Sequence, residues 1–130
     1  MSAVHASDLD DELQTVAQTD VGTIHLVDSF GAFYSEEIRD LARKYLAITE
    51  ATGRQLGIHI HDNQQLAYAN TIEVIAQGAN RLDATIAGLG RGAGHCPLEL
   101  LIILNHPAYQ LRPILQCIEE YITPLRRKMT

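Results

Sequence analysis

The sequence predicts an α/β protein with a parallel sheet. The 130-residue chain alternates short β-rich runs with amphipathic helical segments. Strands that alternate with helices pair in parallel through right-handed crossovers. The composition, 46% apolar and 20% charged, is typical of a globular domain with a buried core. Two architectures fit this order: an open doubly wound sheet, or part of a (β/α) barrel, since a complete barrel takes about 250 residues.

The individual elements follow from apolar periodicity and from residues that start or stop helices. Residues 1–7 are predicted to be a disordered start, and residues 8–130 a single domain. The predicted elements are a helix over 8–19, a strand over 23–28, a helix from the N-cap Ser35 through 46, a strand over 56–61, a helix over 64–77 stopped by Gly78, a strand over 82–86, a helix over 98–104 after Pro97, and a helix from about Pro113 that Pro124 ends.

Charge and hydropathy exclude several classes of partner. The formal net charge is −6, and the basic residues are scattered apart from 126–128, a tail predicted to be solvated. Nucleic acid is therefore not expected as a partner. No apolar run approaches the roughly 20 residues that span a bilayer, so no membrane segment is expected. The polar, acidic start is unlike a signal peptide, and Cys96 and Cys117 form no disulfide framework, so we expect a cytoplasmic protein.

The most informative motif is a pair of histidines in the second predicted strand, within Gly57-Ile-His-Ile-His-Asp-Asn63. Side chains alternate between the faces of a strand, so His59 and His61 project from one face, about 6–7 Å apart. Two imidazoles at this spacing can chelate one divalent metal ion. The carboxyl end of a strand is also where α/β active sites collect. Taken alone, the pair fits two ordinary polar residues on a strand somewhat better than a metal site.

A glycine-rich loop follows the third predicted strand. Its glycines free the backbone to approach a ligand, and exposed N–H groups can cradle an anion. Arg91 could add a contact with phosphate or carboxylate. His95, directly after the loop, is a candidate third metal ligand. The alternatives are a flexible connection and a polar residue at a helix start. The loop glycines are Gly88, Gly90, Gly92 and Gly94.

A carboxylate lies at the end of the first predicted strand, in Asp28-Ser-Phe-Gly31. In this position Asp28 could take a proton, orient a water molecule or bind a substrate hydroxyl. The alternative is an Asx turn or a helix cap.

Taken together, these stretches resemble the DRE-TIM metallolyases. The resemblance lies in "LVDSFGAFYSEEI", in "LGIHIHDNQQLAYANTIEVIAQGANRLDATIAGLGRGAGHCPLELL" and in the flanks, over roughly residues 10–125. Members of this HMGL-like group include 3-hydroxy-3-methylglutaryl-CoA lyase, isopropylmalate and homocitrate synthases, and 4-hydroxy-2-oxovalerate aldolase. The resemblance implies the C-terminal part of a TIM-type (β/α) barrel, with about three parallel strands.

The resemblance also implies a site. The metal would be Mg²⁺, Mn²⁺ or Zn²⁺, polarising a carbonyl or enolate oxygen while a carbon–carbon bond breaks or forms. Asp83 matches the start of the family's last strand, and the loop of 88–94 matches its active-site glycine loop. The predicted site comprises the metal ligands His59, His61 and His95, the catalytic residues Asp28 and Arg91, and the substrate-binding residues Asn63, Asn70, Gly90 and Gly92.

Two departures from the family pattern affect this expectation. The 130 residues contain no Asp-Arg-Glu sequence, the motif of the family's opening strand that supplies a metal-binding Asp and an enolate-stabilising Arg. In addition, His95 stands where the family usually has Asn, and imidazole binds Zn²⁺ or other late transition metals more strongly than an amide oxygen does. His95 is therefore a candidate to compensate for the lost Asp.

A partial barrel exposes strand edges and interior faces, which promotes association. We therefore expect either self-association or a complementary half-barrel subunit, unless the sequence is itself a truncated product. Three functions compete: a metal-dependent lyase or aldolase acting on a small oxo acid or acyl thioester, alone or as part of a split enzyme; a metalloenzyme of altered chemistry (dehydration, cyclisation or hydrolysis) with a three-histidine site; and a non-catalytic interaction subunit.

Overall fold

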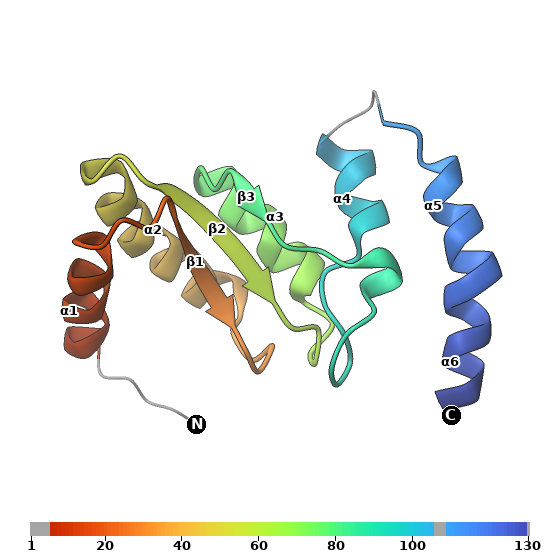
Figure 1. The fold of residues 1–130 in the computed structure, drawn as a ribbon. Helices are drawn as coiled ribbons and strands as arrows, with labels where there is room; N and C mark the ends of the chain where they lie inside the picture. The colour runs from red at the N-terminus through yellow and green to blue at the C-terminus, as the bar shows by residue number, and fades with distance from the viewer. Residues whose placement is uncertain (1–5, 106–108, 130) are drawn as a thin grey trace.

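The structure is a computed structural model that describes residues 6–105 and 109–129 (Figure 1). Three strands alternate with helices, and further helices follow at the C-terminal end. The elements are α1 (Ala6–Ala17), β1 (Thr23–Asp28), α2 (Ser35–Ala51), β2 (Gln55–Ile60), α3 (Ala67–Gln77), β3 (Arg81–Leu82), the 3-10 turn η1 (Ile86–Gly88), α4 (Leu98–Asn105), α5 (Arg112–Cys117), the π-helical turn η2 (Ile118–Ile122) and α6 (Thr123–Met129).

The strands form one parallel sheet in the order β1-β2-β3. Val27 pairs with His59 between β1 and β2, and Gly57 pairs with Arg81 between β2 and β3. The predicted α/β class, a partial barrel of three parallel strands with helices, is confirmed. Among the described residues, no helix is long and apolar enough to cross a membrane.

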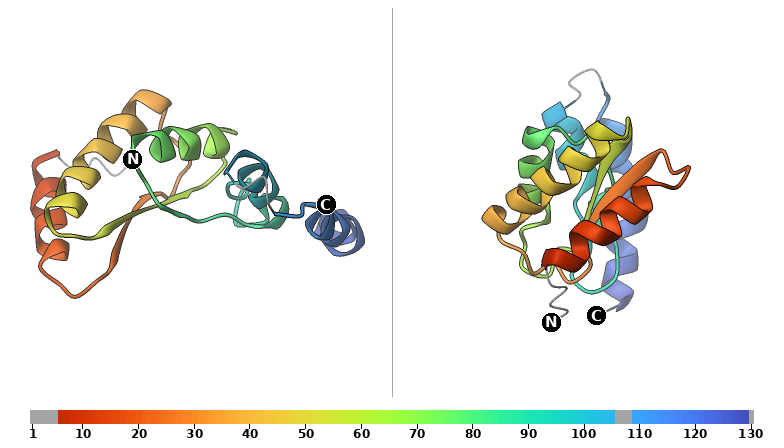
Figure 2. Two further views of the ribbon diagram at one scale, coloured as in Figure 1. Left: turned by 90° about the horizontal axis from the view of Figure 1, so that it is seen from above. Right: turned by 90° about the vertical axis from the view of Figure 1, so that its left-hand side faces the viewer.

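Helices α2 and α3 cover one face of the sheet (Figure 2). The strand residues that point toward them are apolar and buried, because every second side chain of a strand faces the same way. Ile38 and Ala42 of α2 and Val74 of α3 complete this core, and all three are fully buried. The strand side of the core consists of Leu26, Leu56, Ile58 and Ile60.

The opposite face of the sheet carries the alternate residues of the same strands, and no helix covers it in Figure 2. This open face is mostly polar. Gln55 and Arg81 are hydrogen-bonded to each other across it at 2.7 Å. Val27, an apolar member of the face, is 46% exposed.

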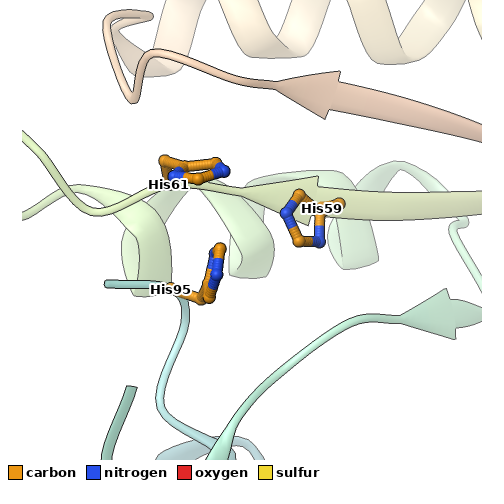
Figure 3. A group of neighbouring side chains, drawn as sticks. All are labelled: His59, His61 and His95. Atoms are coloured by element: carbon orange, nitrogen blue, oxygen red, sulfur yellow. The ribbon is translucent and has the colours of Figure 1, made fainter. Parts of the chain in front are cut away.

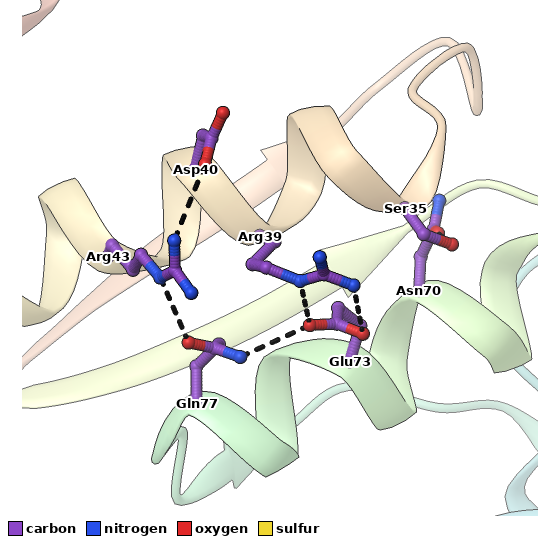
Figure 4. Close-up of polar contacts among 7 residues, drawn as sticks. All are labelled: Ser35, Arg39, Asp40, Arg43, Asn70, Glu73 and Gln77. Atoms are coloured by element: carbon purple, nitrogen blue, oxygen red, sulfur yellow. Dashed lines mark hydrogen bonds and ion pairs between the residues drawn. The ribbon is translucent and has the colours of Figure 1, made fainter.

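A polar network joins α2 to α3 on their outer sides (Figure 4). The Arg39 guanidinium donates to both carboxylate oxygens of Glu73, at 2.7 and 3.3 Å. Gln77 donates to the same carboxylate at 3.1 Å and accepts from Arg43 at 3.4 Å. The two helices are thus held side by side above the apolar core.

The third strand is shorter than the predicted 82–86. Pairing with β2 continues only to the backbone N–H of Asp83, which donates to the carbonyl of Ile58 at 3.0 Å. Beyond it, Thr85 forms an isolated bridge to Pro97 instead. The last residue of the predicted strand, Ile86, instead begins the 3-10 turn η1, which leads into the glycine loop.

Three helix boundaries also differ from the predictions. Pro124 does not end the last helix, because a π-helical turn just before it loosens the backbone where a proline would otherwise clash. The N-cap of α2 is Tyr34, whose N–H is bound by the Glu37 carboxylate. Helix α3 starts only at Ala67, after Gln65 with a φ of +60°. The predicted disordered start lies mostly outside the described residues, and α1 begins at Ala6.

Candidate metal centre

Three histidines from two segments of the chain converge on the open face, at the carboxyl end of β2 (Figure 3). The ring centroids of His59 and His61 are 5.4 Å apart, those of His59 and His95 4.9 Å, and those of His61 and His95 4.4 Å. One ring nitrogen from each lies within 4.8 Å of the other two. This is the spacing of side chains that can share one ion.

The glycine loop brings His95 to the other two histidines. His95 forms a backbone bridge to His61, and the N–H of Asp62 donates to the carbonyl of Gly94 at 2.9 Å. Gly94 has a φ of +102° and lies against the carbonyl of Gly88, so it has no room for a side chain. A Cβ at Gly90 would overlap the ring of His95. The loop can approach His95 so closely only because this position is glycine.

Asp83 holds His59 from outside the cluster. Its Oδ2 lies 3.3 Å from Nδ1 of His59 and 3.5 Å from Nδ1 of His25. A carboxylate that accepts from Nδ1–H fixes the imidazole tautomer and leaves Nε2 free as a ligand. Sequence reasoning matched Asp83 to a strand but missed this role. The alternation of side chains along the third predicted strand could have placed Asp83 on the open face. Only the pairing of β2 with β3 shows that it lies beside His59.

His95 presents an unused nitrogen. Its Nδ1 is buried and has no hydrogen-bond partner among the described residues. Burial, followed by the nearby His61, His59 and Arg91, lowers the pKa of His95, so the neutral, metal-binding form is favoured. Three imidazoles, one of them with an orphaned nitrogen, fit a divalent metal ion with open positions for a substrate. His59, His61 and His95 would hold it.

Asp28, the last residue of β1, is only 2% exposed. Its carboxylate accepts from the backbone N–H groups of Ala32 at 3.2 Å and Phe33 at 3.1 Å, and its carbonyl accepts from the N–H of His61 at 3.1 Å. The structure thus shows Asp28 shaping the loop after β1 and fixing the backbone of a candidate ligand. Its predicted catalytic role stays a prediction.

Asn63 and Asn70 occupy different positions. The amide of Asn63 donates to the carbonyl of Phe30 at 2.9 Å and accepts from the N–H of Ala93 at 3.2 Å, so it ties two loops together beside the cluster. Asn70 is buried in α3, where it donates to the carbonyl of Phe33 at 2.8 Å and accepts from Ser35 at 3.3 Å. Only Asn63 is therefore exposed where a ligand can reach it.

Of the loop residues predicted to take part, Gly90 lies against His95 and Gly92 against the side chain of Asn63. Arg91 is exposed, and its charge is close enough to contribute to the lowered pKa of His95. The loop thus places one arginine beside the histidine cluster.

Comparison with known proteins places this arrangement in a family. The sequence model of the HMGL-like family matches residues 1–114. The chain belongs to the HMGL-like family. The resemblance inferred from the histidine and glycine motifs is therefore confirmed.

Two curated relatives of this HMGL-like chain illustrate its range. It is 33% identical over 107 residues to a 4-hydroxy-2-oxovalerate aldolase of Thermomicrobium roseum, covering 78% of this chain and 29% of that protein. It is 42% identical over 86 residues to an oxaloacetate decarboxylase of Mycobacterium tuberculosis, covering 64% of this chain and 24% of that protein. The chain thus spans less than a third of the length of these curated relatives.

Solved structures show the same fold. The N-terminal domain of a candidate aldolase from Bacteroides vulgatus matches with a TM-score of 0.71 and 29% identity, over 95% of this chain and 43% of that one. Pyruvate carboxylase from Rhizobium etli matches with a TM-score of 0.70 at 16% identity, over 85% of this chain and 11% of that one, and so shares the fold alone.

Proposed function

We propose that this chain carries the histidine metal site of a metal-dependent carbon–carbon lyase or aldolase that acts on a small oxo acid or acyl thioester. The observation that carries the proposal is the convergence of three imidazoles within 4.8 Å on the open face of the sheet. Family membership supports the reaction class. The two curated relatives are named for oxo acids, which supports the substrate class.

In this proposal each group has a defined part. When bound, Mg²⁺, Mn²⁺ or Zn²⁺ would supply Lewis acidity toward a carbonyl or enolate oxygen. Asp83 holds His59 in the ligating orientation, and Asp28 fixes the backbone of His61. Arg91, exposed on the loop, would bind a carboxylate or developing negative charge of the substrate. Asn63, Gly90 and Gly92 would line the substrate pocket. Asn70 is buried, so it would act indirectly, by holding the backbone at Phe33 after β1.

We also infer that another protein surface completes the site. Among the described residues, β1 and β3 each pair only with β2, so both edges of the sheet have free backbone groups. A second copy of the chain, or a complementary half-barrel, would satisfy these edges and cover the open face. Size-exclusion chromatography with light scattering tests this, because a stable monomer that binds neither metal nor a partner would contradict it.

Metal titration tests the central proposal. Chelator-stripped wild type should bind Mn²⁺ or Zn²⁺ in calorimetry, and His61→Ala should lower the affinity by more than about 100-fold, beyond the effect of losing an outer partner of a metal ligand. Gln55→Ala is the control, because Gln55 lies on the same face outside the cluster and contacts Arg81 instead. Absence of metal binding by the wild type would end the proposal. Turnover of oxaloacetate and of 4-hydroxy-2-oxovalerate, with and without chelator, tests the reaction class.

A second candidate function follows from His95 itself. A site of three histidines could serve dehydration, cyclisation or hydrolysis, with Asp28 as acid or base, since three imidazoles leave an open position for activated water. His95→Asn restores the residue usual at this position in the DRE-TIM pattern. If this variant keeps full metal affinity and rate, His95 is not a ligand and the second candidate fails. If metal binds but no substrate turns over, a non-catalytic interaction subunit is favoured.

A further inference from the structure

The glycine loop also lines a hollow together with the last helix, α6. A cavity of about 390 Å³ is lined by loop residues within Gly88–Gly94 and by Arg126 of α6. Small-molecule sites in proteins occupy about 300–1,000 Å³, so the hollow has room for more than a single ion. No acidic side chain lines it.

The loop that lines this hollow carries backbone N–H groups that make no hydrogen bond within the described residues. The neighbouring N–H groups of Gly88, Leu89 and Gly94 are bound to loop carbonyls. In contrast, the N–H groups of residues 90–92 have no acceptor among the described residues. Gly92 has a φ of +64°. Successive free N–H groups around a left-handed residue form a concave site for anions.

Arg126 supplies a full positive charge to the same hollow. It belongs to the basic tail of the sequence, but its guanidinium reaches back to donate to the carbonyl of Ala87 at the start of the loop. A guanidinium has five donors, so this bond leaves others for a ligand. Arg126 also lies beyond residue 114, where the match to the family ends.

We propose that the loop of residues 90–92 and Arg126 form an anion-binding pocket for the phosphate or carboxylate end of a small molecule. Charge-assisted donors from a guanidinium and from backbone amides are the groups that recognise such oxyanions. Gly90 lines the pocket and also lies directly against the ring of His95. A ligand held by its anionic end would thus extend toward the histidine cluster.

Binding of pyrophosphate and of malonate to the full-length, metal-free protein tests this. Amide shifts in ¹⁵N NMR spectra should move most at residues 90–92, and calorimetry should give the affinity. Arg126→Gln should weaken binding about tenfold or more, since a hydrogen bond between charged groups contributes that much. Lys128→Gln, in the same tail but outside the pocket lining, should change it less than about twofold. Stronger binding of pyrophosphate assigns a phosphate ligand, and stronger binding of malonate a carboxylate.

Three results would overturn the proposal: no binding of either anion, equal affinity of wild type and Arg126→Gln, or shifts confined to the tail. Because metal is absent throughout, these results are independent of the metal titration. A chain that binds no metal can still pass this test, and a chain that fails it can still hold the metal.

Discussion

The two faces of the sheet are built from the same strands but differ in chemistry. On the covered face, Ile58 and Ile60 of β2 are almost completely buried under α2 and α3. On the open face, His59 between them is half-buried, and its Nδ1 lies 3.3 Å from the carboxylate of Asp83 rather than in a packed core. Adjacent residues of one strand thus have different parts: one side chain stabilises the fold, and the next is a candidate metal ligand.

This contrast indicates a division of labour within the chain. Burial of apolar surface under two helices fixes the strands. The fixed strands then set the spacing of polar groups on the other face, where little packing energy is gained. Changes on the covered face should therefore alter stability, and changes on the open face should alter ligand binding.

Truncation on the covered face should have the largest effect. Ile58 is 0% exposed, and Ile58→Ala should lower the free energy of unfolding by about 2–5 kcal/mol, because it leaves a cavity in the core. Val27→Ala is the control on the open face, where Val27 is 46% exposed, and should change it by less than about 0.5 kcal/mol. Urea denaturation at fixed protein concentration measures both. Equal losses would show that the open face is also packed, and the comparison would fail.

Removing the partner of His59 should have a smaller, chemical effect. Asp83→Asn should weaken metal binding about 10–100-fold, as changes at outer partners of metal ligands do, while leaving the urea midpoint nearly unchanged. Gln55→Ala is the control, because Gln55 lies on the same face but contacts Arg81 instead. Unchanged metal affinity in Asp83→Asn would show that this carboxylate does not orient the ligand.

Much of the fold was predictable because alternation and periodicity are local properties. The strand over 23–28 was predicted with its observed bounds, and Gly78, with a φ of +124°, stops α3 as expected. The ends of other elements depend on tertiary contacts. The third strand is short because Thr85 pairs with Pro97, and α6 continues past Pro124 because a π-helical turn accommodates the ring.

The candidate site was predictable only in part, for a related reason. The spacing of His59 and His61 is a property of one strand, so the sequence shows it. The approach of His95 was inferred from its place after the glycine loop, and it depends on a backbone bridge to His61 that no local pattern encodes. The roles of Asp83 and Arg126 follow from strand register and from the return of the last helix over the loop. Neither is visible in a pattern of neighbouring residues.

The ion pair between α2 and α3 tests whether the covered side depends on charge as well as on burial. The hydrogen bond from Arg39 lowers the pKa of Glu73, with further contributions from the charges of Arg39 and Arg43 and from Gln77, opposed by desolvation. A carboxylate whose pKa is lower in the folded state than in the unfolded state stabilises the folded protein at pH values above the unfolded pKa, about 4.3. This contribution disappears as pH falls through the folded pKa.

Glu73→Gln should therefore be slightly less stable than wild type at pH 7, by much less than Ile58→Ala, and the difference should vanish toward pH 3. Glu50→Gln, an exposed change on α2, gives the baseline for loss of one surface charge. Urea denaturation across this pH range measures the difference, and a constant difference would mean that Glu73 contributes through packing and not through its charge.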